Sequence, residues 1–123
     1  MGIEFDSQDP TWIYDLETLR FLEVNDAAVR DYGYSRAEFL QLTVLDIRPA
    51  GDVIRFLRSW QHPHESQEDR WVHVGKNGIP FAVLITSREM VFEGRRAEIV
   101  IAKRQSTAVS RPSQQGMTGS LVR

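Results

Sequence analysis

His73 is the side chain whose type and neighbours most suggest chemistry. It follows Trp71 by two residues, so in an extended strand both side chains point to the same side. Facing inward, His73 would offer one hydrogen-bond donor and one acceptor to an apolar interior, and Ser87 would add a hydroxyl group. Small-molecule pockets are typically apolar, with a few convergent polar groups. The sequence therefore predicts a candidate pocket lined by Tyr32, Phe39, Leu57, Trp60, Trp71, His73, Val83, Ile85, Ser87 and Ile99.

The same residues also fit a filled hydrophobic core, in which His73 is hydrogen-bonded to the backbone. Aromatic residues at regular spacing form cores more often than binding sites, so this alternative stays open. An enzyme would use His73 as a general base, but no carboxylate is placed to orient it. No catalytic motif stands out elsewhere in the sequence. We therefore expect a domain that is not itself catalytic.

A second group of polar residues, His62, His64 and Glu65, lies close together in the chain. It could be a metal site, but a solvated loop is the interpretation that the sequence favours, because metal sites also need a supporting shell. The chain has no cysteine. Disulfides, thiolate catalysis and cysteine-rich metal sites are thereby excluded.

Composition excludes further classes. The chain has 123 residues with 15 basic and 17 acidic side chains, and its net charge is −2. These charges are interspersed, which is unlike the basic surface of a nucleic-acid-binding protein. No apolar run is long enough to cross a bilayer, and no signal peptide is recognisable. We expect a cytoplasmic protein with one domain and no membrane span.

Residues 21–42 contain the clearest structural signals. A short strand at the start of this stretch precedes Asn25, a good helix N-cap, and Gly33 can end the helix that follows. Ser35 and Glu38 have the spacing of a capping box for a second helix. Tyr34 and Phe39 would form the hydrophobic staple around that box. Two short helices at a fixed angle are predicted.

The rest of the chain predicts further elements. Residues 12–14 and 20–24 are expected to pair as a hairpin, and residues 43–47 form a single helical turn. Asp52 would cap a third helix that buries Val53, Phe56, Leu57 and Trp60 on one face. Three strands follow at residues 70–75, 81–90 and 97–103, the first two joined by a turn at Asn77-Gly78.

These strands are predicted to have apolar residues on both faces. Thr86, Arg88 and Glu98 mark one face, and the opposite face carries Phe81, Val83, Ile85, Ser87, Ile99 and Ile101. Apolar residues also fall on the marked face, which therefore needs a cover of its own. We expect association through this face, as a homodimer or with an output domain, with Val72, Leu84 and Val100 as interface candidates.

The order and spacing of several motifs resemble those of a PAS sensory domain. The resemblance rests on Val24-Asn25-Asp26-Ala27-Ala28, on Tyr32-Gly33-Tyr34-Ser35-Arg36 with Glu38-Phe39, on Lys76-Asn77-Gly78 and on Phe92-Glu93-Gly94-Arg95. It implies an α+β fold, a five-stranded antiparallel sheet with short helices packed on one face. It places the sensor domain at residues 10–105. Composition predicts residues 1–9 as an N-terminal arm and 106–123 as a flexible linker or tail.

The resemblance also implies a function. PAS domains sense small molecules or partners and relay a conformational change, in signalling proteins that include histidine kinases and cyclic-dinucleotide enzymes. A dimerisation or protein-interaction module without a ligand is the alternative. Asn25 would be the family's core asparagine, which ties its helix to the next. No cofactor can be named. Without cysteine we expect no covalent flavin or coumarate photochemistry, and without a histidine in the third helix we do not expect haem.

One departure from the family concerns the end of the last strand. Many PAS domains finish this strand with an Asp-(Ile/Val)-Thr motif that leads into a helical linker. Here the corresponding residues are Lys103-Arg104-Gln105-Ser106-Thr107, without an aspartate. We therefore expect an unusual linker or a stand-alone domain.

Overall fold

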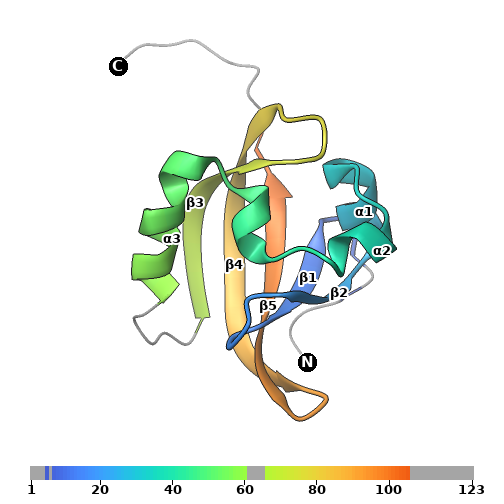
Figure 1. Cartoon of the computed structure of the whole chain (residues 1–123), viewed down its shortest axis with the longest axis vertical. Coiled ribbons are helices and arrows are strands. Elements are labelled where there is room, and N and C mark those ends of the chain that lie inside the picture. Colours follow the sequence, from blue (N-terminus) through green and yellow to red (C-terminus); the bar gives the residue numbers. More distant parts are fainter. Residues whose placement is uncertain (1–4, 6, 61–65, 106–123) are drawn as a thin grey trace.

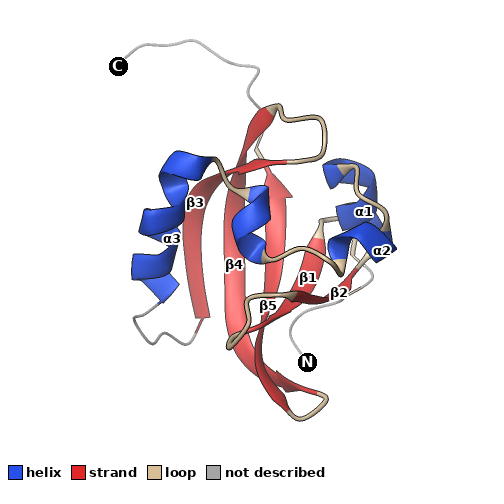
Figure 2. Ribbon diagram, viewed as in Figure 1, coloured by secondary structure: helices blue, strands red, loops and turns tan. Residues whose placement is uncertain are grey.

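Five antiparallel strands form one sheet in the order β2-β1-β5-β4-β3. This computed structural model describes the backbone of residues 5, 7–60 and 66–105, and the side chains of these residues except 59, 60 and 66–68. The described helices lie against one face of the sheet (Figures 1 and 2). The expected α+β architecture is confirmed. Along the chain the elements are β1 (Thr11–Asp15), β2 (Phe21–Val24), α1 (Asp26–Tyr32), α2 (Arg36–Phe39), the 3₁₀ helices η1 (Val44–Ile47) and η2 (Ala50–Asp52), α3 (Val53–Trp60), β3 (Ser66–Val74), β4 (Pro80–Phe92) and β5 (Arg95–Arg104).

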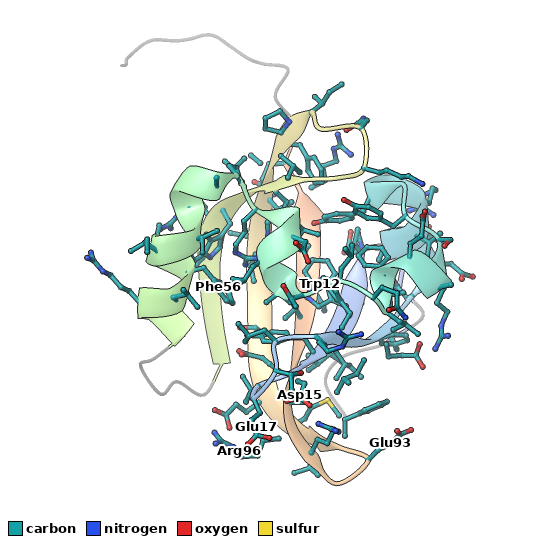
Figure 3. The ribbon with its side chains drawn as sticks, viewed as in Figure 1. Trp12, Asp15, Glu17, Phe56, Glu93 and Arg96 are labelled. Atoms are coloured by element: carbon teal, nitrogen blue, oxygen red, sulfur yellow. The ribbon has the colours of Figure 1, made fainter. Side chains whose placement is uncertain are left out.

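The turn between β1 and β2 is held by a buried carboxylate. Asp15 accepts the backbone N–H groups of Glu17 at 2.7 Å and Thr18 at 3.1 Å. Its second oxygen pairs with the guanidinium of Arg95 at the start of β5. Figure 3 shows Asp15 and Glu17 close to the end of the sheet where the β4–β5 hairpin turns.

Helix α1 begins and ends as the sequence predicts. Asn25 is the N-cap and its Oδ1 accepts the N–H of Ala28 at 2.9 Å, while Gly33 ends the helix at a φ of 83°. The expectation that Asn25 ties α1 to the next helix is wrong. Its Oδ1 also accepts the N–H of Thr11, and its amide nitrogen donates to the carbonyls of Phe5, Ser7 and Asp9. Asn25 therefore ties α1 to β1 and the segment before it.

Helix α2 has the predicted capping box. Ser35 Oγ accepts the N–H of Glu38 at 3.1 Å, and the Glu38 carboxylate accepts the N–H of Ser35 at 2.9 Å. The rings of Tyr34 and Phe39 lie 5.4 Å apart around it, as the staple requires. Lys76 binds Glu38 at 2.8 Å, so the turn after β3 also contacts α2.

The third helix begins at Val53, as predicted, but it follows directly on a 3₁₀ turn. Asp52 does not cap it but belongs to η2. Its buried Phe56 packs edge-on against Trp71 with ring centroids 6.0 Å apart. Strands β4 and β5 are longer than predicted at both ends, whereas β3 begins four residues earlier than predicted, at Ser66, and ends one residue earlier, at Val74. None of the described helices has the length and apolar content needed to cross a membrane.

The predicted faces of β4 are confirmed, but those of β5 are reversed. Val83, Ile85 and Ser87 are buried on the helix-covered face. Val100, expected outside, pairs with Ser87 and is 5% exposed in the core, whereas Ile99, expected to line the pocket, pairs with the exposed Arg88. The faces of β5 were predicted wrongly because a charged residue was taken to lie on the outer face.

That charged residue is Glu98, which is in fact 3% exposed on the helix-covered side. The phenol of Tyr14 donates a hydrogen bond to its carboxylate at 2.9 Å. A buried carboxylate is tolerated when it is hydrogen-bonded. The outer face therefore carries Ile99 and Ile101 in place of Glu98 and Val100.

Candidate functional site

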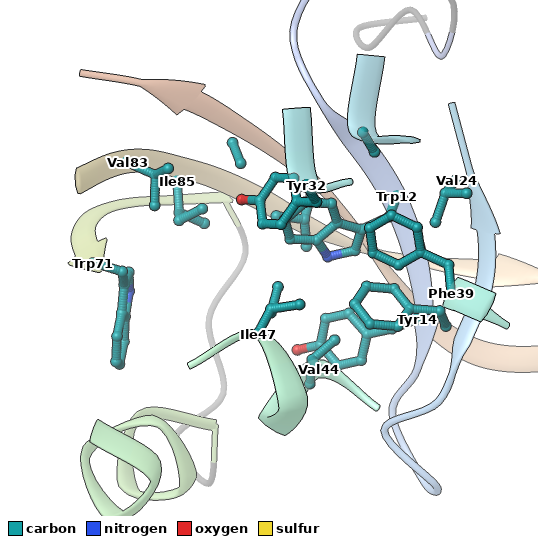
Figure 4. Close-up of a cluster of buried hydrophobic side chains, with 14 of the residues drawn as sticks. Trp12, Tyr14, Val24, Tyr32, Phe39, Val44, Ile47, Trp71, Val83 and Ile85 are labelled. Carbon is teal, nitrogen blue, oxygen red and sulfur yellow. The ribbon is translucent and has the colours of Figure 1, made fainter. Parts of the chain in front are cut away.

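The interior between the helices and the sheet contains a cluster of buried polar side chains. We call it the interior polar cluster, and its members are Tyr14, Tyr32, Arg48, His73 and Glu98. Each is at most 9% exposed. It lies among large apolar side chains, which include Trp71, Val83 and Ile85 on one side and Trp12 and Phe39 on the other (Figure 4). Polar groups in such surroundings are either hydrogen-bonded or costly.

His73 is fully buried on β3 and paired with Tyr32. Its Nδ1 lies 2.6 Å from the Tyr32 hydroxyl, and the two side chains share a hydrogen bond. Trp12 packs against both rings, with centroids 5.5 Å from Tyr32 and 5.8 Å from His73. The other ring nitrogen, Nε2, is buried and has no hydrogen-bond partner among the described residues. His73 therefore presents one unused polar atom to the interior.

The position of Tyr32 opposite His73 is fixed by a contact between the end of α1 and the end of β3. It is the last residue of α1, and its carbonyl accepts the N–H of Lys76, in the turn after β3, at 2.8 Å. Gly75 permits this approach, because a Cβ atom there would lie 2.5 Å from the Tyr32 carbonyl oxygen. The end of α1 is thus attached to the end of β3, which places the Tyr32 phenol opposite His73.

Arg48 enters the interior from the end of η1. This turn is capped by Thr43, whose hydroxyl accepts the N–H of Leu45 at 3.2 Å. Backbone hydrogen bonds from Phe21 to Leu42 and from Val44 to Leu19 attach the segment to β2 and to the turn before it. Arg48 itself is extended, with φ −118° and ψ 145°, as expected for a residue before proline.

The guanidinium of Arg48 is buried between aromatic rings. Its central carbon lies 4.0 Å from the ring centroid of Phe56 and 5.2 Å from that of Trp71. Nη1 donates to the Val44 carbonyl at 2.5 Å. Nε is buried without a hydrogen-bond partner, and no ion pair of Arg48 is found in the part of the chain that the structure describes. Among the described residues, the cation is therefore held by a carbonyl and by ring faces.

Burial sets the protonation states of the cluster. It lowers the pKa of Arg48 to about 10, although the nearby Tyr14 and Tyr32 hydroxyl groups act in the opposite direction. Burial, and then the charge of Arg48, lower the pKa of His73 well below its usual value. Burial also raises the pKa of both tyrosines. At neutral pH the imidazole of His73 and the two phenols are therefore neutral, and Arg48 is a cation.

This arrangement is suited to binding. His73 is oriented by a phenol and not by a carboxylate, and its lowered pKa makes it a weak base. No group of three His, Cys, Asp or Glu side chains within the described residues could hold a metal ion. What the cluster offers is unused hydrogen-bonding capacity at Arg48 and His73, surrounded by apolar walls.

Most of the predicted pocket residues lie around this cluster. Buried on the helix-covered side are Tyr32, Phe39, Trp71, His73, Val83, Ile85 and Ser87. Leu57 is only partly buried, and packs against the core. Ile99 lies on the outer face of the sheet. The side chain of Trp60 and residues His62, His64 and Glu65 lie outside the described part of the structure, so the predicted metal alternative has no structural description.

Sequence reasoning missed Arg48, Tyr14 and Glu98. A lone arginine or glutamate is normally exposed, and no periodicity marked these two as buried. One signal was available for Arg48. It directly follows the apolar residues of η1 and precedes Pro49, which favours an extended backbone at that position.

The outer face of the sheet is the second feature that the sequence singled out. Val72 and Leu84 lie on it, half-buried, together with Ile99 and Ile101. Val100 does not, because it is part of the core. Two of the three predicted interface candidates therefore remain on this surface.

Comparison with solved structures shows the PAS fold. A PAS domain from a two-component sensor histidine kinase has 20% sequence identity and a TM-score of 0.67, with 82% of this chain and 88% of that chain covered. The PAS domain of a Colwellia psychrerythraea protein has 17% identity and a TM-score of 0.72, with 82% and 90% covered. No family model matches the sequence, and a comparison with curated proteins finds no significant match. The chain has a PAS-domain fold, as its motifs implied.

The same comparison corrects the expectation about cofactors. A Rhodobacter sphaeroides LOV protein has 12% identity and a TM-score of 0.69, with 85% of this chain and 64% of that chain covered. Light-oxygen-voltage photoreceptors thus share this fold, and the exclusion drawn from the absence of cysteine was wrong. A thiolate is needed only for a covalent adduct, so the cysteine count says nothing about a cofactor held without one.

Proposed function

We propose that the chain is the sensory domain of a cytoplasmic signalling protein and that it binds a small molecule between its helices and its sheet. The domain itself is not catalytic, and its output is an attached signalling enzyme such as a histidine kinase or a cyclic-dinucleotide enzyme. The fold that it shares with a sensor-kinase PAS domain supports the signalling role. Fold alone does not give function, so the binding role is argued from the site.

The observation that carries the binding role is the pair of unused polar atoms at Arg48 and His73. In native proteins most buried polar atoms have a hydrogen-bond partner. A ligand that supplies the missing partners would bind best to one packing of η1 and α3 against the sheet. It would shift the population of the domain toward that packing. The shift would reach the output enzyme through the outer face of the sheet or through the ends of the chain.

Extraction tests this proposal. The chain is purified without denaturant, extracted under denaturing conditions and analysed by mass spectrometry, and a metabolite library is screened by thermal shift. We expect a small molecule in the extract, or library compounds that raise Tm by mass action. An empty extract together with a library that leaves Tm unchanged would contradict the proposal.

A second candidate function is a ligand-free interaction module. It is favoured by the half-buried apolar side chains of the outer face, Val72, Leu84, Ile99 and Ile101. A surface of this kind is typical of a protein contact. Sedimentation would then show a dimer that Leu84→Glu dissociates, whereas Ala37→Glu, an exposed change on α2, leaves it intact. A monomer at high concentration in both variants and in the unmodified chain would count against self-association.

A further inference from the structure

Two buried polar side chains in the interior polar cluster lack partners. Arg48 is 9% exposed and its Nε has no hydrogen-bond partner; His73 is 0% exposed and its Nε2 has none, in each case among the described residues. Burying one unsatisfied polar atom is costly, and burying an unpaired charge costs more. Two such atoms in one interior indicate that a group from outside the described chain completes them.

The two side chains reach the same part of the interior. The guanidinium of Arg48 lies 5.2 Å from the ring centroid of Trp71, and His73 follows Trp71 on the same face of β3. Burial first, and then the charge of Arg48, lower the pKa of His73. In Figure 4 the hydroxyl oxygens of Tyr14 and Tyr32 both point toward the side of the core on which Trp71 lies. Arg48 and His73 therefore both lie beside Trp71 on the helix-covered side of the sheet.

The missing group should be an anion. Asp52 raises the pKa of Arg48, yet no ion pair or hydrogen bond joins the two within the described residues. A planar guanidinium matches a carboxylate through two parallel N–H donors. His73 can donate from Nε2 when Nδ1 accepts from the Tyr32 phenol, which is consistent with their separation of 2.6 Å. Arginine and histidine together thus provide hydrogen-bond donors for one carboxylate.

Charge and surroundings narrow the class of anion. Arg48 has no ion pair among the described residues, and Glu98, the carboxylate of the cluster, accepts a hydrogen bond from Tyr14. One monoanion would therefore pair with the guanidinium, whereas a phosphate dianion would add a second buried negative charge. The walls beside Arg48 are the ring faces of Phe56 and Trp71, with Ile85 on the same face of the sheet. These walls are apolar and fit an apolar ligand body.

We propose that the ligand of this domain is a small monocarboxylate with an apolar body, whose carboxylate is bound by Arg48 and by Nε2–H of His73. This inference rests on the proposed function and names the chemical class of its ligand. An ordered water at the same atoms is the competing occupant, since buried waters also satisfy unpaired polar groups.

Paired probes test the proposal. Calorimetry and thermal shift on the full chain would compare benzoate, phenylacetate and hexanoate with the corresponding amides, which have the same shape without the charge, and with inorganic phosphate. We expect one or more of the carboxylates to bind, and to bind about tenfold to a hundredfold more tightly than its amide, the range for a hydrogen bond to a charged group. Equal binding of acid and amide, binding of phosphate alone, or binding of none of the probes would overturn the proposal.

Variants locate the site. Arg48→Met should weaken carboxylate binding about tenfold or more. The matched control is Arg55→Met, because Arg55 also lies over the Trp71 ring, at 3.8 Å, but its side chain is 52% exposed and pairs with Asp69. Should Arg48→Met not fold, Arg48→Lys keeps the charge and loses the planar fork, and it should weaken binding while the amides are unaffected. Unchanged affinity in the folded variant would overturn the proposal.

Failure of this inference can be told apart from failure of the proposed function. A non-acidic molecule recovered by denaturing extraction would overturn the carboxylate and leave the sensory function in place. An empty extract with no response to any library compound would remove the small-molecule function as a whole. Ordered water at Arg48 and His73 in a crystal grown with saturating probe carboxylate would also overturn the inference.

Discussion

Acidification should destabilise this protein through His73. The imidazole is fully buried, and burial first and then the charge of Arg48 lower its pKa in the folded state well below the ordinary value of 6.5. In the unfolded chain the same imidazole binds a proton once the pH falls below about 6.5. The unfolded state then holds more protons than the folded state. Stability is therefore lost as the pH falls through that value.

The loss of stability can be estimated because the unfolded state binds one more proton than the folded state. Each pH unit below about 6.5 removes about 1.4 kcal/mol from the free energy of unfolding until the folded state also protonates. Between pH 6.5 and pH 5.0 the loss reaches up to about 2 kcal/mol, a large part of the 5–15 kcal/mol typical of a domain. Tm would fall by about 4–8 °C for each kcal/mol in a domain of this size.

Urea unfolding at several pH values between 7.5 and 5.0 measures this slope. His73→Gln removes the titrating group and keeps an acceptor for the Tyr32 hydroxyl, so its slope should be flatter by about one proton. The double variant His62→Gln/His64→Gln removes the other two histidines and should keep the slope of the unmodified chain. An NMR titration in which the His73 imidazole protonates near pH 6.5 would refute the reasoning, as would an unchanged slope in His73→Gln.

Three further predictions concern the scaffold. Gly75→Ala would place a Cβ 2.5 Å from a backbone carbonyl oxygen and should cost about 1–3 kcal/mol in urea unfolding, whereas Gly51→Ala meets nothing within 4 Å and should be near neutral. Asp15→Asn should lower stability at pH 7. Burial alone would raise the pKa of Asp15, but its hydrogen bonds with two backbone N–H groups and a guanidinium lower it. The difference in stability between the variant and the unmodified chain should therefore vanish as the pH falls below about 4. Val100→Ala in the core should lower the free energy of unfolding by about 2 kcal/mol, and Ile99→Ala on the outer face by under about 1 kcal/mol. The reverse order would mean that Ile99 faces the helices, as the sequence predicted.

The local elements could be predicted from sequence because their signals are contained in a few neighbouring residues. The N-cap at Asn25, the left-handed Gly33 and the capping box of Ser35 and Glu38 all depend on side chains that bond to their own turn. The alternation along β4 was equally local. Motif order then gave the sheet and its helical cover, and the structure agrees with both.

The facing of β5 could not be predicted in the same way. Alternation sets which residues share a face but not which face is covered, and a carboxylate normally marks the solvent side. Glu98 reverses that rule because Tyr14, 84 residues earlier in the chain, donates a hydrogen bond to it. Such a partner is known only when β1 is placed beside β5.

The candidate site was half predictable. His73 and Tyr32 were both identified as inward-facing residues, but their hydrogen bond joins positions 41 residues apart, and it depends on the approach that Gly75 allows. Arg48 was missed because nothing adjacent in sequence marks a buried arginine. Its surroundings come from η1, α3 and β3 together.

A small molecule held in the interior polar cluster through Arg48 would be seen by native mass spectrometry. The chain is purified under non-denaturing conditions, with Arg48→Met and Arg55→Met prepared in parallel. The prediction is an added mass on the unmodified chain and on Arg55→Met that is lost on denaturation and is absent from folded Arg48→Met. An added mass that Arg48→Met retains, or none on any of the three proteins, would contradict it.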